Sequence, residues 1–299
     1  AFGFNALNDT TSGCFNTAIG GCALACNTTG CENTASGYGT LLKNTTGCRN
    51  SGFGMYALYK TSTGKFNTAV GYQAMFDNTT GNHNVTVGQC TLHSNTTGEN
   101  NVAIGNRALV NNTTANGNTA VGRCSLHDTT SGSYNTFIGR HSGIAITGGD
   151  QNCAYGNYSG LALTTGSQNV FIGDNSGTAI TTGNNNCFLG HATGGSLTTG
   201  DNNLLLGTNA GGASSPSNPA DGTSNVIVVG NNSHTNAYIK IDWTVTSDRR
   251  DKTNITPFTA GLSWINKLNP VTYKWDMRSD YENGVPDGSK KGSKLYLGL

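Results

Sequence analysis

Apolar and polar positions along the chain recur with a period of 17 residues. An asparagine starts each repeat and a glycine follows it four residues later, as in Asn67 and Gly71. The three residues between them favour β-structure in most repeats, for example in Asn101–Gly105. A fixed short period predicts one structural rung stacked on itself rather than a globular core. The repeated asparagines are Asn16, Asn33, Asn50, Asn67, Asn84, Asn101, Asn118, Asn135, Asn152, Asn169, Asn186 and Asn203.

Each rung carries signals for two short strands and two corners. The repeated glycine can adopt a positive φ, which suits a tight corner. Thr-Thr-Gly, as at Thr79–Gly81 and Thr96–Gly98, indicates a second corner. The sequence therefore predicts an all-β fold, a parallel β-solenoid of 17-residue rungs over residues 1–213. Rungs stacked at ~4.8 Å would make the shaft roughly 55–60 Å long.

Two apolar columns and one polar column are expected inside the coil. The residue before each glycine, such as Ile19 or Val70, is expected to point inward, since side chains alternate along a strand. The leucine four residues after the glycine, such as Leu24 or Leu58, predicts a second column. The repeated asparagines predict a ladder of stacked amides, which satisfies polar groups that are costly to bury unpaired.

From Asn135 onward the rung changes while its period does not. Glycine replaces the leucine, and an aliphatic residue appears three positions later. We interpret this as a change in the cross-section of the coil or in the packing of neighbouring chains. The glycines are Gly143, Gly160, Gly177, Gly194 and Gly211, and the new aliphatic residues are Ile146, Leu163, Ile180 and Leu197.

Composition excludes several classes of function. The 299 residues include 43 glycines, only 11% are charged and the net charge is +1, so no footprint for nucleic acid is visible. No run of apolar residues is long enough to span a membrane, and we expect no membrane insertion. Low hydrophobicity alone could suggest disorder, but disorder does not need an invariant register. The chain opens inside a rung without a signal peptide, which predicts more protein upstream.

The nine cysteines do not form an obvious disulfide framework. Cys14, Cys31 and Cys48 share one repeat position, and neighbouring rungs would bring such cysteines within disulfide distance. The alternative, which we favour, is that cysteine fills its positions as a small buried group. Assembly in a reducing compartment agrees with that interpretation.

The register breaks near Pro216, which indicates a domain boundary. The next Asn-Val-Ile-Val block starts at Asn225, 22 residues after Asn203, which predicts an insertion of five residues. More than half of the charged residues and all three tryptophans lie after residue 235. We therefore divide the chain into a shaft (1–213), a junction with an insertion and a last rung (214–246), and a C-terminal segment (247–299).

The Asn-x-Ala-Ile-Gly rung resembles the head repeats of trimeric autotransporter adhesins and, more closely, related repeats in phage and viral tail fibres. The resemblance covers about residues 1–235, although the adhesin repeat is typically shorter. It implies a homotrimer of parallel β-coils. One thin coil buries little, and three chains packed around an axis would bury one face of each.

The C-terminal segment resembles the autoproteolytic intramolecular chaperone of endosialidases and other phage tail fibres. The resemblance rests on Ser-Asp-x-Arg-x-Lys-x-Asn-Ile from Ser247, a short amphipathic helix predicted over 262–268, and an Asn-Pro-Val-x-Tyr-x-Trp strand up to Trp275. Asp251 departs from the family pattern, in which an aliphatic residue precedes the lysine. The family domain is longer, so we expect this chain to carry its first part, a small α+β fragment.

The resemblance implies a cleavage chemistry for this segment. Ser247 would attack the carbonyl of Thr246, and Lys252 would act as the base, since serine is a weak nucleophile until a base takes its proton. Any enzymatic activity would then be self-cleavage between Thr246 and Ser247, and the shaft itself would not be an enzyme. From the residues alone, the alternative is that Ser247 caps a helix and that Lys252 is a solvated charge.

The leading hypothesis is a structural, trimeric fibre for host-surface attachment, located in a virion tail fibre or on an extracellular surface. Its partners would be two further copies of the chain, a glycan or protein receptor on the host cell, and an upstream fibre or baseplate protein. We expect no cofactor and no nucleic acid.

Two other functions remain open at this point. A glycan-degrading tailspike fragment would need paired carboxylates, but acidic residues in the shaft are sparse. An ice-binding solenoid would need regular threonine columns, but valine, cysteine and leucine interrupt the column of Thr17 and Thr34.

Neither the histidines nor the Asn-Thr-Thr triplets give a strong signal for a metal site or for glycosylation. His93 and His127 share a column two rungs apart, about 9.6 Å, too far for one metal, although threefold symmetry could gather copies of one histidine. Asn-Thr-Thr triplets match the N-glycosylation pattern and are better explained as corners unless the host is eukaryotic. Their asparagines are Asn27, Asn44, Asn78, Asn95 and Asn112.

Overall fold

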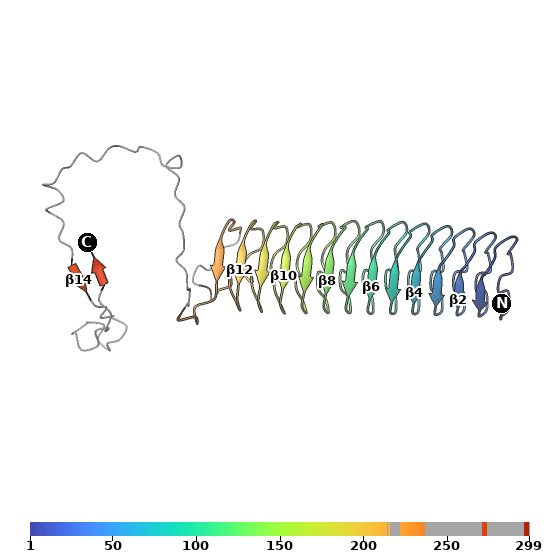
Figure 1. The fold of residues 1–299 in the computed structure, drawn as a ribbon, viewed down its shortest axis with the longest axis horizontal. Helices are drawn as coiled ribbons and strands as arrows, with labels where there is room; N and C mark the ends of the chain where they lie inside the picture. Colours follow the sequence, from blue (N-terminus) through green and yellow to red (C-terminus); the bar gives the residue numbers. More distant parts are fainter. Residues whose placement is uncertain (214, 216–221, 237–270, 274–295, 299) are drawn as a thin grey trace, which may run out of the picture. The chain divides into compact units, whose positions relative to one another are not determined.

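Residues 1–213 and 222–236 of the computed structural model form one long β-solenoid (Figure 1). The structure also describes residue 215 and the short segments 271–273 and 296–298. Thirteen short strands pair in sequence order, every pair parallel, into a single sheet along one side of the coil. Each strand lies one 17-residue repeat after the last up to β12, as in the pairing of Thr17 with Thr34. The predicted all-β parallel solenoid is confirmed.

Every strand of the solenoid has three residues. In order they are β1 (Thr17–Ile19), β2 (Thr34–Ser36), β3 (Ser51–Phe53), β4 (Thr68–Val70), β5 (Val85–Val87), β6 (Val102–Ile104), β7 (Thr119–Val121), β8 (Thr136–Ile138), β9 (Cys153–Tyr155), β10 (Val170–Ile172), β11 (Cys187–Leu189), β12 (Leu204–Leu206) and β13 (Ile227–Val229).

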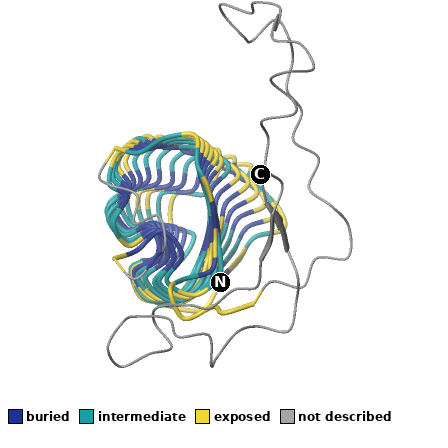
Figure 2. Cartoon of the chain, turned by 90° about the vertical axis from the view of Figure 1, so that its left-hand side faces the viewer, coloured by how far each residue is buried: buried dark blue, intermediate teal, exposed yellow. Residues whose placement is uncertain are grey.

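The inward-facing residue of each strand is the middle one, not the last. Ala18 and Ala103 are buried, while Ile19 and Ile104 before the glycines are exposed. The expectation that residues such as Ile19 and Val70 point into the coil is therefore wrong. Because side chains alternate, burying the middle residue of a three-residue strand turns both of its neighbours outward. Viewed along the stack, the buried segments of successive rungs superpose (Figure 2).

The predicted leucine column is confirmed, but its backbone is not a strand. Leu24, Leu58 and Leu126 are completely buried, and Met75 takes the same place in its rung. Each has a positive φ, 51° at Leu24 and 54° at Leu58, in the left-handed region. Hydrogen bonds still join neighbouring rungs here, since the Leu24 amide donates to the carbonyl of Thr40. The second strand expected in each rung is thus absent from the described coil.

The asparagine ladder is present along the shaft. Asn84 Oδ1 accepts the backbone N–H of Asn101 at 2.9 Å and its side-chain amide at 3.1 Å. The Asn84 side-chain amide donates to Asn67 Oδ1 and, at 2.9 Å, to the carbonyl of Gly98. Both asparagines of the pair are fully buried. Each ladder asparagine therefore bonds to the rung before it, to the rung after it and to its own rung, and both the oxygen and the nitrogen of its buried amide have partners.

Replacing Asn84 with alanine is expected to lower the free energy of unfolding by about 2–4 kcal/mol, because the buried N–H of Asn101 loses its acceptor and the lost amide leaves a cavity. Asn106→Ala is the matched control: this amide bonds only at the exposed surface, to Gln89, and its loss should cost within about 0.5 kcal/mol. Urea unfolding followed by circular dichroism measures both. Equal losses for the two variants would contradict a stabilising ladder.

A second amide column runs through the N-terminal half of the shaft. Asn44 donates to Asn27 Oδ1 at 2.7 Å, and Asn95 donates to Asn78 Oδ1 at 2.8 Å. These are the asparagines of the Asn-Thr-Thr triplets, and they are completely buried. The folded rung therefore hides the amide that a glycosylation enzyme would need. From Ile146 onward the same column is occupied by the aliphatic residues seen in the sequence.

The change of rung at Asn135 is an exchange of large and small residues across the core. In most rungs of the first half the strand contributes alanine and the opposite wall leucine, as in the pair Ala120 and Leu126. In the second half the wall contributes glycine and the strand a large residue, as in Gly143 and Phe137, with Ala154 as the exception. A Cβ on Gly143 would lie 2.5 Å from Phe137 Cδ1, so no side chain fits there. The predicted change in cross-section is thus a repacking inside one coil.

The glycine that ends each strand is required by the close stacking of rungs. Gly54 has a φ of +130°, and a Cβ added to it would lie 2.6 Å from the carbonyl oxygen of Gly71. Any side chain here would push two rungs apart. The 17-residue spacing of these glycines is therefore a direct consequence of stacking.

The junction shifts the register by six residues rather than the predicted five. Leu204 of β12 pairs with Ile227 of β13, 23 residues later. Val226, not Asn225, takes the ladder position, and its N–H donates to Asn203 Oδ1. Asn225 instead continues the column of Asn202, whose amide donates to it at 2.8 Å. The shaft belongs to a compact unit of residues Ala1–Ala237, and Tyr238–Leu299 form a second unit.

Candidate interaction surface and cleavage segment

The outer face of the sheet carries a row of exposed apolar side chains. The first and third residues of every strand point outward, and the third position is apolar in all rungs but one. Ile104 is 39% exposed and Tyr155 is 59% exposed. Since the strands are in register, these side chains form a column that is apolar in every rung but one, which we call the outer apolar column. Its members are Ile19, Phe53, Val70, Val87, Ile104, Val121, Ile138, Tyr155, Ile172, Leu189, Leu206 and Val229, with Ser36 as the exception.

A parallel sheet with one bare apolar face is unusual. In most parallel sheets apolar residues point to both faces, so other parts of the protein cover both faces. In this shaft the inner face is filled by the coil itself, and the outer face carries the outer apolar column beside a mixed column of first-position residues that includes threonine, serine, cysteine and valine. An extended exposed apolar surface marks an interaction site. The sequence signals this column in part, since a large residue follows a small one in seven of the thirteen strands of the shaft, but hydrophobicity alone predicts that the large residue lies in the core.

The residues proposed for cleavage, Thr246, Ser247 and Lys252, lie outside the described residues, as does the helix predicted over 262–268. The strand predicted after Pro270 is present. It is β14 (Val271–Tyr273), which pairs antiparallel with β15 (Tyr296–Gly298).

Residues 247–294 match the family model of the chaperone of endosialidase. The match begins at Ser247, the first residue of the motif seen in the sequence. Searches of curated proteins and of solved structures found no match. The chain therefore combines a β-solenoid with a C-terminal segment of the chaperone-of-endosialidase type.

Polar side chains on the shaft pair with one another along the stack. Arg49 Nε donates to Glu32 Oε2 at 2.7 Å, and this bond holds the pKa of Glu32 below its ordinary value. Lys60 Nζ lies 2.7 Å from Asp77 Oδ1. Because both pairs are partly exposed, each adds little to stability. These carboxylates face cations one rung away, which suits a structural role better than glycan hydrolysis.

Three histidines of the shaft, His83, His93 and His141, pack against aromatic rings. His93 stacks on Phe76 with ring centroids 5.2 Å apart, and burial lowers its pKa below the ordinary value. Phe76 stacks in turn on Tyr59 at 4.8 Å. Within the described residues, no three His, Cys, Asp or Glu side chains gather closely enough to hold a metal ion. Nor does the described part of the chain contain a helix of the length and apolarity needed to cross a membrane.

The cysteines are thiols in the structure, and most are not buried. Among the nine, Cys124 is buried, while Cys14 and Cys153 are exposed and the others are partly exposed. The interpretation of cysteine as a small buried group is therefore wrong for all but Cys124.

Threonines do point outward in the first position of several strands, including Thr17 and Thr34. The outer apolar column runs beside them, and valine, cysteine and leucine interrupt the threonine column itself.

Proposed function

We propose that this chain forms a homotrimeric attachment fibre of a virion, of the tail-fibre or tailspike type. Three shafts pack around a common axis through their outer apolar columns. The observation that carries the proposal is the match of residues 247–294 to the chaperone of endosialidase directly after a solenoid with a bare apolar face. The fibre joins an upstream fibre or baseplate protein to a glycan or protein receptor on the host.

A dedicated chaperone suits the folding problem of such a shaft. Each rung pairs with the next only after 17 residues have closed a coil, and three chains must also start in the same register. Non-local strand pairing folds slowly and exposes edges that aggregate. A C-terminal segment that holds three chains together would set this register. Its later removal would leave the fibre kinetically trapped in its folded state.

We infer that the segment is released by its own serine. The Ser247 hydroxyl gives its proton to Lys252 and attacks the carbonyl carbon of Thr246. The Thr246–Ser247 C–N bond breaks, the departing α-amino group of Ser247 takes the proton back from Lys252, and an ester now joins Thr246 to the Ser247 oxygen. Water then hydrolyses this ester, which frees the carboxylate of Thr246 and the hydroxyl of Ser247. Lys252 needs a lowered pKa for this role, as burial of an amine provides.

Light scattering after gel filtration is expected to give three times the mass of the processed chain. Ile104→Glu should convert this assembly to monomers while the circular dichroism of the coil persists, because it places one carboxylate from each chain in the apolar interface. The matched control is Thr97→Glu, which adds the same charge at an exposed corner outside the strands. A monomeric wild type, or an Ile104→Glu variant that stays trimeric, would contradict packing through the outer apolar column.

A further inference from the structure

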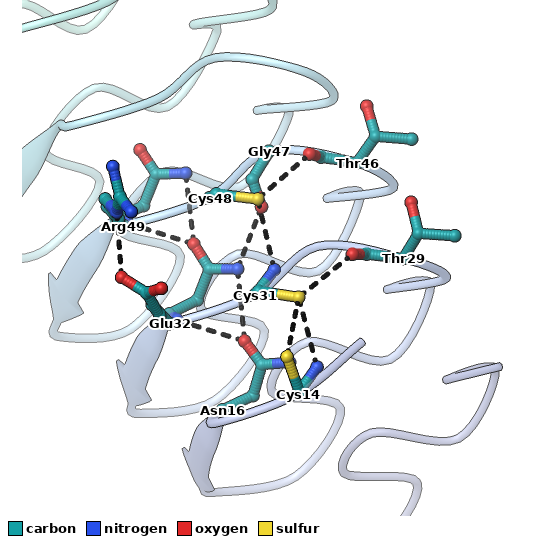
Figure 3. A network of polar contacts seen from close by, with 11 residues as sticks. Cys14, Asn16, Thr29, Cys31, Glu32, Thr46, Gly47, Cys48 and Arg49 are labelled. Atoms are coloured by element: carbon teal, nitrogen blue, oxygen red, sulfur yellow. Dashed lines mark hydrogen bonds and ion pairs between the residues drawn. The ribbon is translucent and has the colours of Figure 1, made fainter. Parts of the chain in front are cut away.

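Three cysteines occupy successive rungs of one surface column, two residues before the ladder asparagines. They are Cys14, Cys31 and Cys48 (Figure 3). The backbone is fixed in register around them, since the N–H of Glu32 donates to the carbonyl of Cys14 at 2.9 Å and the N–H of Asn33 donates to Asn16 Oδ1 at 3.0 Å. The first two thiols are therefore held opposite each other by backbone bonds.

Side chains in this column accept a hydrogen bond from the backbone one rung earlier. The amide of Cys14 donates to Cys31 Sγ at 3.2 Å, and the amide of Cys31 donates to Cys48 Sγ at 3.2 Å. Later rungs do the same with oxygen, as where the amide of Asn116 donates to Ser133 Oγ at 3.1 Å. Because a serine suffices for the hydrogen bond, stacking does not require the sulfur.

The sulfur atoms of Cys14 and Cys31 lie 3.0 Å apart (Figure 3). A disulfide bond is about 2.05 Å long and joins Cα atoms about 4.4–6.8 Å apart, a range that includes the ~4.8 Å spacing of in-register rungs. The bond can therefore form by a small movement of the side chains alone. In the other columns, cysteines that share a position are separated by at least one rung, as Cys153 and Cys187 are by Val170.

The two thiols are accessible and unequal. Cys14 is exposed and Cys31 partly exposed. The Cys14 thiol donates to the Cys31 sulfur, which lowers the pKa of Cys31 and raises that of Cys14. Cys31 is therefore the more readily deprotonated of the two, and the thiolate is the form that attacks a disulfide.

We propose that Cys14 and Cys31 are a redox-sensitive pair that forms a reversible disulfide between two consecutive rungs when the shaft meets a small disulfide oxidant such as oxidised glutathione. The Cys31 thiolate attacks one sulfur of the oxidant, forms a mixed disulfide and releases one glutathione thiolate. Cys14 then loses its proton and attacks the Cys31 sulfur, displacing the second glutathione thiolate. Two protein thiols are oxidised, and one oxidised glutathione is reduced to two thiols. The shaft gains a covalent cross-link on transfer from a reducing to an oxidising compartment.

The test uses the whole chain, reduced, freed of reductant and incubated with oxidised glutathione. Acid quenching, alkylation with N-ethylmaleimide in denaturant and mass spectrometry then count the free thiols. We expect the nine alkylated thiols to fall to seven. Chymotryptic cleavage after Phe15 and Leu24 separates the two cysteines, so the oxidised chain should yield a linked peptide pair that joins Cys14 to Cys31.

Two serine variants locate the bond, and serine is tolerated in this column because Ser133 already occupies it. Cys48→Ser should still form the Cys14–Cys31 link, whereas Cys31→Ser should form no cross-link at all. A wild type without the linked peptide, a link from Cys31 to Cys48, or a cross-link between chains on a non-reducing gel would each overturn the proposal.

Discussion

Replacing Ser247 with alanine is expected to abolish release of the C-terminal segment in the full-length protein. Alanine has no hydroxyl to attack the carbonyl of Thr246, so no ester can form. Wild-type protein should yield a product that ends at Thr246, and the variant should yield only the uncleaved chain. Denaturing gel electrophoresis and intact mass measure both.

The role of Lys252 as a base can be tested separately from the effect of its positive charge. Lys252→Arg keeps the positive charge, but arginine stays protonated and cannot accept the serine proton. We expect cleavage to slow at least about a hundredfold, the usual contribution of a positioned base. Lys290→Arg, in the same matched segment, is the control and should cleave like the wild type. Normal cleavage in Ser247→Ala or Lys252→Arg would refute the assignment of that residue.

The same variants separate release from assembly. If the segment drives trimerisation before it is cut off, Ser247→Ala should still give a trimer, now of uncleaved chains. Loss of trimers in that variant would mean that cleavage precedes assembly, contrary to the proposed order. Persistence of trimers with blocked cleavage would separate the two roles of the segment.

The sequence predicts the architecture well because stacking imposes the same requirement on every rung. The ladder from Asn16 to Asn203 and the glycines beside it recur every 17 residues, since any other residue leaves a buried polar group unpaired or strikes the next rung. The strand propensity of individual residues is less informative about the backbone conformation within one rung. Leu24 favours a strand by its apolarity, yet its backbone lies in the left-handed region, with its amide donating to Thr40 of the next rung and its carbonyl accepting from Asn27 of its own rung.

The direction of side chains was harder to predict than the fold. A strand of three residues has only one inward position, and Ala18 takes it while the larger Ile19 faces outward. Hydrophobicity alone favours the opposite assignment, because it cannot distinguish a core column from an interface column. The length of the insertion before β13 is also hard to predict from the sequence. Asn225 resembles a ladder asparagine, which predicts five inserted residues, but Val226 occupies the ladder position and the insertion has six.

Phe137 and Gly143 should behave as one packing unit, the first at which the core changes. Phe137→Ala is expected to cost about 3–5 kcal/mol of unfolding free energy, because it empties a buried aromatic site. Gly143→Leu should also destabilise strongly, since its Cβ alone would lie 2.5 Å from Phe137 Cδ1 and 3.1 Å from Leu126 Cδ2. The double variant recreates the alanine–leucine pair of the preceding rung, Ala120 and Leu126.

We therefore expect the double variant to be more stable than the sum of the single effects predicts, with a coupling of about 2–3 kcal/mol. The control combines Phe137→Ala with Gly194→Leu, which lies three rungs further along, roughly 14 Å away. Those two effects should add within about 0.5 kcal/mol. Urea unfolding of all variants gives both cycles. Equal coupling in the two cycles would contradict a local exchange of volume between Phe137 and Gly143.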